Sequence, residues 1–467
     1  MEATMQLILV CLAVLPLAAA AHRRVGSAGA MPQPGTVEVT DPDVARRMIV
    51  DHAAAFSNHP AVPFAVDLDA GHPKTHSINS APYGALWRAL RSNLTAGVLH
   101  ASPASRRSAA APPGRSWPTS SAPSAREAVV VTVRDALYGA AFGAVARMCF
   151  GDGVVAERDV RAMRRTLREF FHSDVDAGLL ARSRLARLLR WRQALVSRRG
   201  GSGGSGTGDI RSYVDSLLDL RVPDGDDGET ASGKRRRRPL RDDEMVRLVW
   251  EFLGYGTETV VACVEWTLAR LVTHLEVQDK LYRELSGGDR REERLQDAPY
   301  LRAVILESLR LHPPVPFVLR DVAGPEGAAA AGGCTTTPPP DDDGAPVVRF
   351  VFMAEDNGRC RKSWTDPDEF RPERFLVGGE GEDAGAVPGR KEIKMMPFGA
   401  GRRHCPGAGL AVIHIGCFVA ALVREFHWAP PPTANGGGGV DLAAINALFV
   451  KVMASPLRAQ ISPRMST

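Results

Sequence analysis

The segment MPFGAGRRHCPGAG, residues 396–409, holds one cysteine, Cys405, in a turn rich in glycine, proline and arginine. No second cysteine lies within ten residues, so neither a local disulfide nor a paired zinc-ligand motif is indicated. A thiolate is a soft metal ligand, and a single one leaves most coordination sites of a metal to another group. The porphyrin of a haem fills four of these coordination sites. An ordinary buried cysteine at a helix start is the alternative for Cys405 taken alone.

Four neighbours of Cys405 suit a thiolate site. Gly401 and Gly407 let the backbone fold closely enough for N–H groups to point at the sulfur. Phe398 can cover the sulfur and exclude water, and Arg403 adds positive charge suited to an anionic carboxylate. The full spacing Phe398-x-x-Gly401-x-Arg403-x-Cys405-x-Gly407 therefore favours a cofactor site over a structural cysteine.

Three further residues can form a charged network. The segment ESLR places Glu307 and Arg310 one helical turn apart, and PERF supplies Arg374. A buried carboxylate needs guanidinium partners with bidentate geometry, which two arginines provide. Without Arg374 and Cys405, the pair Glu307 and Arg310 would be interpreted as a surface helix pair.

The elements that must position these residues are mainly helical. Apolar residues recur at helical spacing over four ranges, 127–150, 240–274, 298–311 and 407–426. Gly254 and Gly256 interrupt the centre of the longest of them. Strand signals are few, the clearest being VVRFVFM at 347–353. The sequence therefore predicts a mainly α fold with a small β component.

Three low-complexity stretches separate these patterns. Residues 101–126 are rich in Ser, Ala and Pro, and residues 200–208 are rich in Gly and Ser. Residues 323–346 are rich in Pro and Asp. Such compositions do not bury enough apolar surface to form a packed element. We interpret all three as loops or unstructured inserts.

Composition limits the classes of function. The 467-residue chain has 58 Lys and Arg against 53 Asp and Glu, a net charge of +5. This excess is too small to indicate nucleic-acid binding, and the basic run 234–238 is interpreted as a solvated loop. The seven cysteines are widely spaced and form no CxxC, which favours reduced thiols in a reducing compartment.

The N-terminus carries an apolar segment. Leu7–Ala21 is uncharged, and as a helix it would span about 22 Å, short of a bilayer core of about 30 Å. A cleaved signal peptide is therefore the alternative to a signal anchor at residues 1–24. One acidic residue precedes the stretch and two arginines follow it, so the positive-inside rule favours the anchor with the bulk in the cytoplasm. The sequon at Asn93 would matter only in a secreted chain.

The cysteine spacing resembles the haem-binding signature FxxGxRxCxG of the cytochrome P-450 superfamily. ESLR and PERF precede it in that family's order, and EIKMMPFGAGRR and LVREFHW are most similar to plant A-type members. The resemblance covers roughly residues 40–460. It implies the cytochrome P-450 fold, mainly α with small β-sheets, and a haem-thiolate monooxygenase domain over residues 25–467.

The resemblance also implies roles for these residues. Cys405 would ligate the iron of haem b, with Phe398, Gly401, Arg403 and Gly407 as cofactor-binding residues around it. Trp87 and Arg91 of WRALR, one helical turn apart, would both reach a haem propionate. The carboxylate Glu307 and its two arginines would form the family's buried network behind the haem.

A further motif, YGTET at 255–259, is similar to the family's AGxDT. Glu258 and Thr259 would be the acid–alcohol pair that organises water and delivers protons to dioxygen. The implied reaction inserts one oxygen atom from O2 into a small apolar organic substrate. Taken alone, a Glu-Thr pair in a helix carries no such meaning.

Partners and location follow from the same resemblance. The chain shows no flavin or nicotinamide motif, so electrons would come from a separate NADPH-dependent flavoprotein reductase. Arg402, Arg403 and His404 would make the proximal face basic enough for an acidic partner. An anchored member would lie in the endoplasmic reticulum membrane with its catalytic domain in the cytoplasm.

The sequence departs from the family pattern in ways that leave two alternatives open. Tyr255 stands where the family has a small residue, and it can crowd dioxygen or substrate. The stretch 101–126 replaces an ordered helix and loop of the family, and 323–346 interrupts its strand region. One alternative is therefore a haem-binding but catalytically impaired relative. The other is a secreted, non-haem globular protein whose apolar N-terminus is a cleaved signal.

Overall fold

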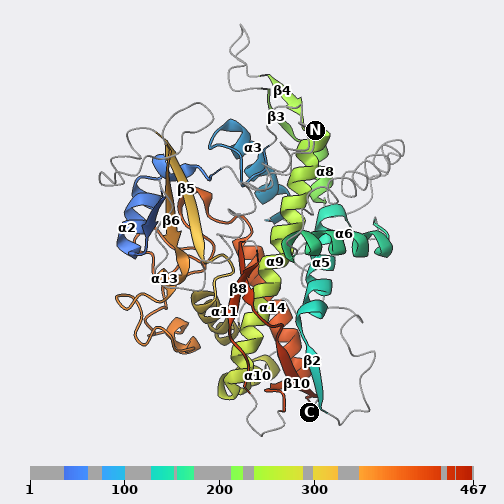
Figure 1. Ribbon diagram of the computed structural model, residues 1–467, viewed down its shortest axis with the longest axis vertical. Coiled ribbons are helices and arrows are strands. Elements are labelled where there is room, and N and C mark those ends of the chain that lie inside the picture. Colours follow the sequence, from blue (N-terminus) through green and yellow to red (C-terminus); the bar gives the residue numbers. More distant parts are fainter. Residues whose placement is uncertain are drawn as a thin grey trace, which may run out of the picture.

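The computed structural model describes ten stretches of the chain: 36–60, 76–99, 128–151, 155–172, 212–224, 236–287, 298–323, 347–432, 439–447 and 449–464. The expected anchor at 1–24, the stretches 101–126 and 200–208, and 324–346 lie outside the described residues. What is described is mainly α-helical with small β-sheets, which confirms the predicted fold class (Figure 1).

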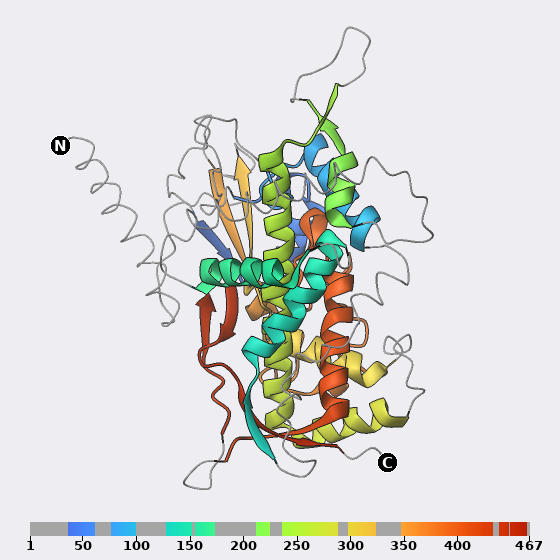
Figure 2. The same cartoon turned by 90° about the vertical axis from the view of Figure 1, so that its right-hand side faces the viewer.

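Helix α9 (Asp242–Thr273) runs through the centre of the molecule (Figures 1 and 2). Its start is fixed by Glu244, whose carboxylate accepts the Arg241 N–H over 2.8 Å. All residues from Val260 to Ala269 are buried, as expected of a helix that is apolar all round. The helix continues through Gly256, contrary to the predicted interruption. A Cβ there would lie 3.3 Å from Val145, so glycine lets helix α5 pack closely.

The long helices α5 (Arg134–Phe150), α10 (Leu275–Gly287), α11 (Pro299–Leu311) and α14 (Ala408–Glu425) pack against α9, as does a shorter helix described below. Helices α11 and α14 match the predicted ranges 298–311 and 407–426. The predicted helix at 127–150 is wrong over its first turn, because Val129–Thr132 form strand β2. That run is β-branched, and it pairs with a C-terminal strand, which a local helical pattern cannot foresee.

The described strands form four small sheets. The first has the order β1 (Thr36–Val39), β6 (Val347–Met353), β5 (Phe317–Ala323), with β1 parallel and β5 antiparallel to β6. The second has the order β2, β10 (Arg458–Pro463), β7 (Phe426–Ala429). Two hairpins pair β3 (Arg221–Pro223) with β4 (Arg237–Pro239) and β8 (Ala444–Ala447) with β9 (Val450–Met453). Strand β6 coincides with the predicted 347–353.

The remaining helices are short or peripheral. They are α2 (Pro42–Arg46), α3 (Ala85–Leu94), α6 (Glu157–His172), α8 (Tyr213–Asp219) and α13 (Ala354–Gly358), with π- or 3-10 turns η1 (Arg47–Asp51), η2 (Ala55–Ser57), η3 (Thr95–Leu99), η6 (Pro372–Phe375) and η7 (Gly401–Arg403). In Figure 1 the sheet of β5 and β6 lies with α2 on one side of α9, and α5 and α6 lie on the other.

Helix α14 begins three residues after Cys405 and packs against α9, α10 and α11. Within the described residues it is the one helix long and apolar enough to cross a membrane, and half of it is buried in the protein. A core helix meets the same criteria, so α14 carries little weight as a membrane span.

Candidate active site

The loop before α14 holds Cys405 in a tight turn. The Cys405 N–H donates to the Phe398 carbonyl oxygen over 2.8 Å, which closes the loop. Gly401 has a φ of 68°, in the left-handed region that favours glycine. A Cβ on Gly401 would lie 2.5 Å from the Ile49 carbonyl oxygen, so glycine is required where the loop packs on η1.

The surroundings of the Cys405 thiol act on its charge in opposite directions. Burial raises the pKa of the thiol, whereas the Gly407 N–H and the Arg91 guanidinium lower this pKa. A Cβ on Gly407 would lie at an ordinary contact distance of 3.8 Å from the Cys405 sulfur. The close backbone approach expected at both glycines is thus needed at Gly401 only, and Gly407 contributes through its N–H.

Cys405 lines a cavity of about 600 Å³ between α9, the cysteine loop and strand β5. Several expected site residues line the same cavity, namely Trp87, Arg91, Thr259, Phe398, Arg403 and Gly407. Most of the rest is apolar, including Met148, Leu248, Phe252, Val260, Val318 and Phe449. The structure therefore brings the lone thiol, two aromatic rings and several cations to one largely apolar space.

Three cationic or donor side chains meet this cavity without a carboxylate partner among the described residues. Trp87 Nε1 and Arg320 Nε are buried there without a hydrogen-bond acceptor. The Arg91 guanidinium lies over the Trp87 ring at 5.4 Å. Burial and the neighbouring Arg403 lower the pKa of Arg320 to about 9. Such a set is suited to an anionic group in the cavity.

Sequence reasoning missed Arg320. It lies in β5 in the segment FVLRDV, and only 1 % of it is exposed. An arginine at an inward position of a predicted strand would have been the available signal.

Arg403 lines the cavity, as expected, but it is buried rather than exposed on the proximal face. Its Nε donates to the Ser57 carbonyl over 2.7 Å, and its two Nη atoms donate to the Ile78 and Ala81 carbonyls over 3.1 and 2.5 Å. Because it is only 7 % exposed, it adds no charge to the protein surface. The expectation that Arg403 makes the proximal face basic is therefore wrong. Burial and Arg91 lower its pKa to about 10.

The expected acid–alcohol pair on α9 faces two directions. Thr259 lines the cavity, and its Oγ1 donates to the Tyr255 carbonyl over 2.7 Å. Glu258 is buried outside that lining and accepts the Tyr138 hydroxyl over 2.7 Å. Tyr255 also lines the cavity, with its ring edge-on to Phe449 at 5.0 Å. The alcohol therefore reaches the cavity directly, whereas the acid contacts α5.

The three residues of the expected charged network lie together in the core. Arg310 donates from Nε and Nη2 to both oxygens of Glu307, over 2.7 and 2.8 Å. Arg374 Nε lies 3.3 Å from the same carboxylate. All three side chains are at most 2 % exposed. The network joins α11 to η6 and stands apart from the cavity.

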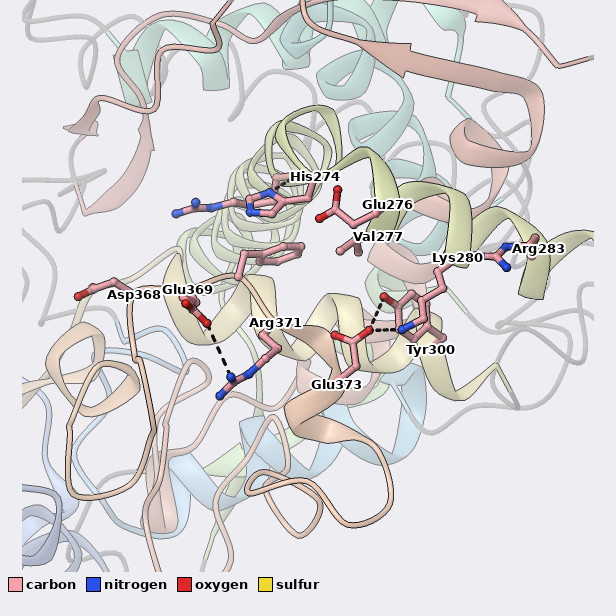
Figure 3. A pocket seen from close by; sticks show the side chains of 12 residues that line it. His274, Glu276, Val277, Lys280, Arg283, Tyr300, Asp368, Glu369, Arg371 and Glu373 are labelled. Atoms are coloured by element: carbon pink, nitrogen blue, oxygen red, sulfur yellow. Dashed lines mark hydrogen bonds and ion pairs between the residues drawn. The ribbon is translucent and has the colours of Figure 1, made fainter.

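A second pocket, of about 580 Å³, lies at the surface between α10, α11 and residues 368–373 (Figure 3). Some of its polar groups pair with one another: Lys280 Nζ lies 2.5 Å from Glu373 Oε1, and the Tyr300 hydroxyl donates to the same oxygen over 3.0 Å. Its lining contains no cysteine, unlike that of the first cavity. The chemistry expected from the sequence therefore belongs to the first cavity.

Comparison with known proteins identifies the family. The sequence model described as Cytochrome P450 matches residues 30–325 and 351–436. The chain belongs to the cytochrome P450 family. Cytochrome P450 89A9 of Arabidopsis thaliana is 32% identical over 92% of this chain and 84% of its own length. Cytochrome P450 78A5 of the same plant is 33% identical over 56% of this chain and 45% of its own length.

Solved structures show the same fold. A zebrafish cytochrome P450 with progesterone has a TM-score of 0.69 at 20% identity, covering 95% of this chain and 97% of its own. The retinoic acid-bound cyanobacterial CYP120A1 has a TM-score of 0.66 at 17% identity, covering 92% and 89%. The fold is thus the P450 fold, as the sequence predicts.

As a member of this family, the chain is a P450 monooxygenase of plant type, and its cofactor is thiolate-ligated haem b. The cavity of the P450 fits that group, because it offers a thiol together with buried donors that lack an anionic partner. The non-haem alternative is therefore wrong. Neither the fold nor the relatives support the catalytically impaired alternative.

Proposed function

We propose that this P450 inserts one atom of O2 into a small apolar organic substrate, with electrons from a separate NADPH-dependent flavoprotein reductase. One observation carries the proposal: Cys405 shares a mainly apolar cavity with the unpartnered donors Trp87 Nε1 and Arg320 Nε. A largely apolar lining suits an apolar substrate. The domain extends over residues 25–467, with the low-complexity stretches as inserts.

Cys405 would supply the thiolate ligand of the haem, and Phe398, Gly401, Arg403 and Gly407 shape and hold its loop. Trp87, Arg91 and Arg320 would bind the haem propionates, because Trp87 Nε1 and Arg320 Nε are buried without an acceptor and Arg91 lines the same cavity. When bound, the haem would supply the activation of dioxygen, which a thiolate ligand favours. Glu307, Arg310 and Arg374 keep α11 fixed to η6 behind the site.

In this proposal Thr259 and Glu258 relay protons to the distal side of the cavity. Thr259 lines the cavity, where its hydroxyl oxygen would accept a hydrogen bond from a water that delivers protons to dioxygen. Glu258, the adjacent residue, would relay protons to it, and the Tyr138 hydroxyl donates to the Glu258 carboxylate. Burial raises the pKa of Tyr138, so this phenol stays protonated and remains a donor to the carboxylate.

The reductase docks on the face near the cysteine loop. Exposed Arg402 and Arg88 lie over the ring of Tyr83, at 5.0 and 5.7 Å from its centroid, and supply positive charge there. Such a face suits an acidic partner. We further propose that residues 1–24 anchor the chain in the endoplasmic reticulum membrane, with the catalytic domain in the cytoplasm.

The test is the absorption spectrum of the reduced carbon-monoxide complex of the full chain. We expect the red-shifted Soret band of thiolate-ligated haem in the wild type and in Cys360→Ser, and its loss in Cys405→Ser. Cys360 is a matched control because it is also a free, partly exposed cysteine but lies outside the cavity lining. Identical spectra for Cys405→Ser and wild type would exclude Cys405 as the ligand.

A reconstitution tests the partner and the reaction. The purified chain with an NADPH-dependent flavoprotein reductase should oxidise NADPH and consume O2 in the presence of a substrate. Normal carbon-monoxide spectra without any NADPH-coupled O2 consumption across a panel of apolar compounds would favour the catalytically impaired alternative instead.

A further inference from the structure

Glu251 is a cavity-lining acid that the reaction outlined above does not use. It lies on α9 four residues before Tyr255, on the same helix face. Its Oε2 accepts the Ile78 N–H over 2.9 Å, and its Oε1 accepts the Asn79 N–H over 2.8 Å. Both carboxylate oxygens are thus bound to two consecutive backbone amides of one turn, in residues 77–81.

The same turn is held from its other side by Arg403. The guanidinium donates from Nη1 to the Ile78 carbonyl and from Nη2 to the Ala81 carbonyl. One carboxylate and one guanidinium therefore satisfy two N–H and two C=O groups of residues 77–81. Since Arg403 precedes Cys405 by two residues, the turn links the cysteine loop to helix α9.

The turn forms part of the cavity wall. Ile78 and Asn79 both line the cavity, and Ile78 is only 8 % exposed. The Asn79 Oδ1 lies 2.7 Å from Nδ1 of His59, another lining residue. Hydrogen bonds to a carboxylate are stronger than those to a neutral acceptor, and leaving buried amides without an acceptor is costly. The position of this wall therefore depends on Glu251.

We propose that Glu251 is a positioning residue of this P450: its carboxylate fixes residues 77–81 as a wall of the cavity and thereby selects which substrates bind. The inference rests on the proposed function, because it takes the cavity to be the substrate site. Each oxygen of Glu251 accepts one backbone N–H of the turn, so the carboxylate is assigned to the wall rather than to the substrate. Its effect is on the shape of the cavity and the rigidity of one wall.

Glu284 provides a matched control. It lies on α10, and its two oxygens accept the Tyr300 and Leu301 N–H groups over 2.8 and 2.9 Å. The geometry is that of Glu251, with one carboxylate bound to two consecutive amides, but Glu284 does not line the cavity. Glu284→Gln therefore removes the same kind of interaction at a site remote from the substrate.

The experiment uses the full-length haem-loaded chain and two probes that ligate haem iron. Imidazole is the small probe, and 4-phenylimidazole adds a phenyl ring that fills more of the cavity of about 600 Å³. We expect Glu251→Gln to weaken the binding of 4-phenylimidazole by about tenfold, which is the effect of losing one charge-assisted hydrogen bond. The affinity for imidazole should stay unchanged. Glu284→Gln should leave the affinity for both probes unchanged. Hydrogen exchange of a peptide spanning residues 77–81 should accelerate in Glu251→Gln only.

Each outcome decides the inference. The inference is overturned if both variants bind 4-phenylimidazole equally weakly, or if Glu251→Gln binds this probe as tightly as the wild type. If Glu251→Gln fails to retain haem, Glu251→Asp decides instead: its shorter carboxylate should weaken 4-phenylimidazole but not imidazole, and unchanged binding of both probes overturns the proposal. A wild-type chain without the thiolate carbon-monoxide spectrum would refute the proposed function itself, which is a separate result.

Discussion

The guanidinium of Arg310 and the carboxylate of Glu307 form a bidentate pair with no exposed surface on either side chain. Arg310 also donates to the Gly358 and Pro367 carbonyls over 2.6 and 2.7 Å. Burial of these charges is tolerated because nearly every donor and acceptor has a partner. The pair therefore fixes α11 against the loops that follow it.

Removing one partner should be strongly destabilising. We expect Glu307→Gln to lower the free energy of unfolding by about 3–5 kcal/mol, because the buried Arg310 loses its counter-charge and Arg374 keeps only Glu380. Lys280→Ala is the control, since its 2.5 Å contact with Glu373 is solvent-exposed and contributes less than about 1 kcal/mol. Thermal unfolding and haem content would be measured. Equal losses in both variants would contradict the role of the buried network.

Glycine at 401 should be irreplaceable. In Gly401→Ala the added Cβ meets the Ile49 carbonyl at 2.5 Å, and the positive φ adds about 1–2 kcal/mol of strain. We expect loss of haem from most of the purified protein. Gly409→Ala adds the same methyl group in α14 with nothing within 4 Å, so it should be neutral or stabilising by up to about 1 kcal/mol. Retention of haem in Gly401→Ala would show that the loop adopts another conformation.

His312 should make the protein less stable in acid. Burial and the nearby Arg270 lower the pKa of His312 from 6.5 to about 2, and its ring stacks on Trp266 at 4.1 Å. Below pH 6.5 the unfolded chain takes up a proton at this histidine that the folded chain does not. The stabilisation present above pH 6.5 is thus lost as pH falls, by about 1.4 kcal/mol per pH unit.

The measurement is urea unfolding at pH 6.5 and 5.0. His312→Gln keeps an acceptor for Arg270 but cannot titrate, so its stability should depend less steeply on pH than that of the wild type. Parallel pH profiles would mean that His312 is protonated in the folded protein, or that it is accessible to solvent.

Thr259 should control how efficiently the electrons of NADPH are used for product formation. In Thr259→Val the cavity loses a hydroxyl, so we expect product formation per NADPH to fall by about 100-fold while hydrogen peroxide rises. Thr267→Val is the control: Thr267 donates to the Cys263 carbonyl on the same helix, but outside the cavity lining. Equal coupling in wild type and Thr259→Val would remove Thr259 from the proton path.

The sequence by itself determined the parts that depend on neighbouring residues. The glycine and cysteine spacing from Phe398 to Gly407 specified the loop, and apolar periodicity gave α11, α14 and strand β6 within one or two residues. These features are local, because turn chemistry and side-chain periodicity act over a few positions. The family resemblance carried by the same residues supplied the fold.

Only the tertiary structure decided which way the charged side chains face. Arg403 lies inward against three carbonyls, Glu258 contacts Tyr138, and Arg320 and Glu251 line the cavity. Each orientation depends on segments far away in sequence, such as residues 77–81 for Arg403 and α5 for Glu258. A buried charge takes the direction in which partners satisfy it, and those partners are brought together only when the chain folds.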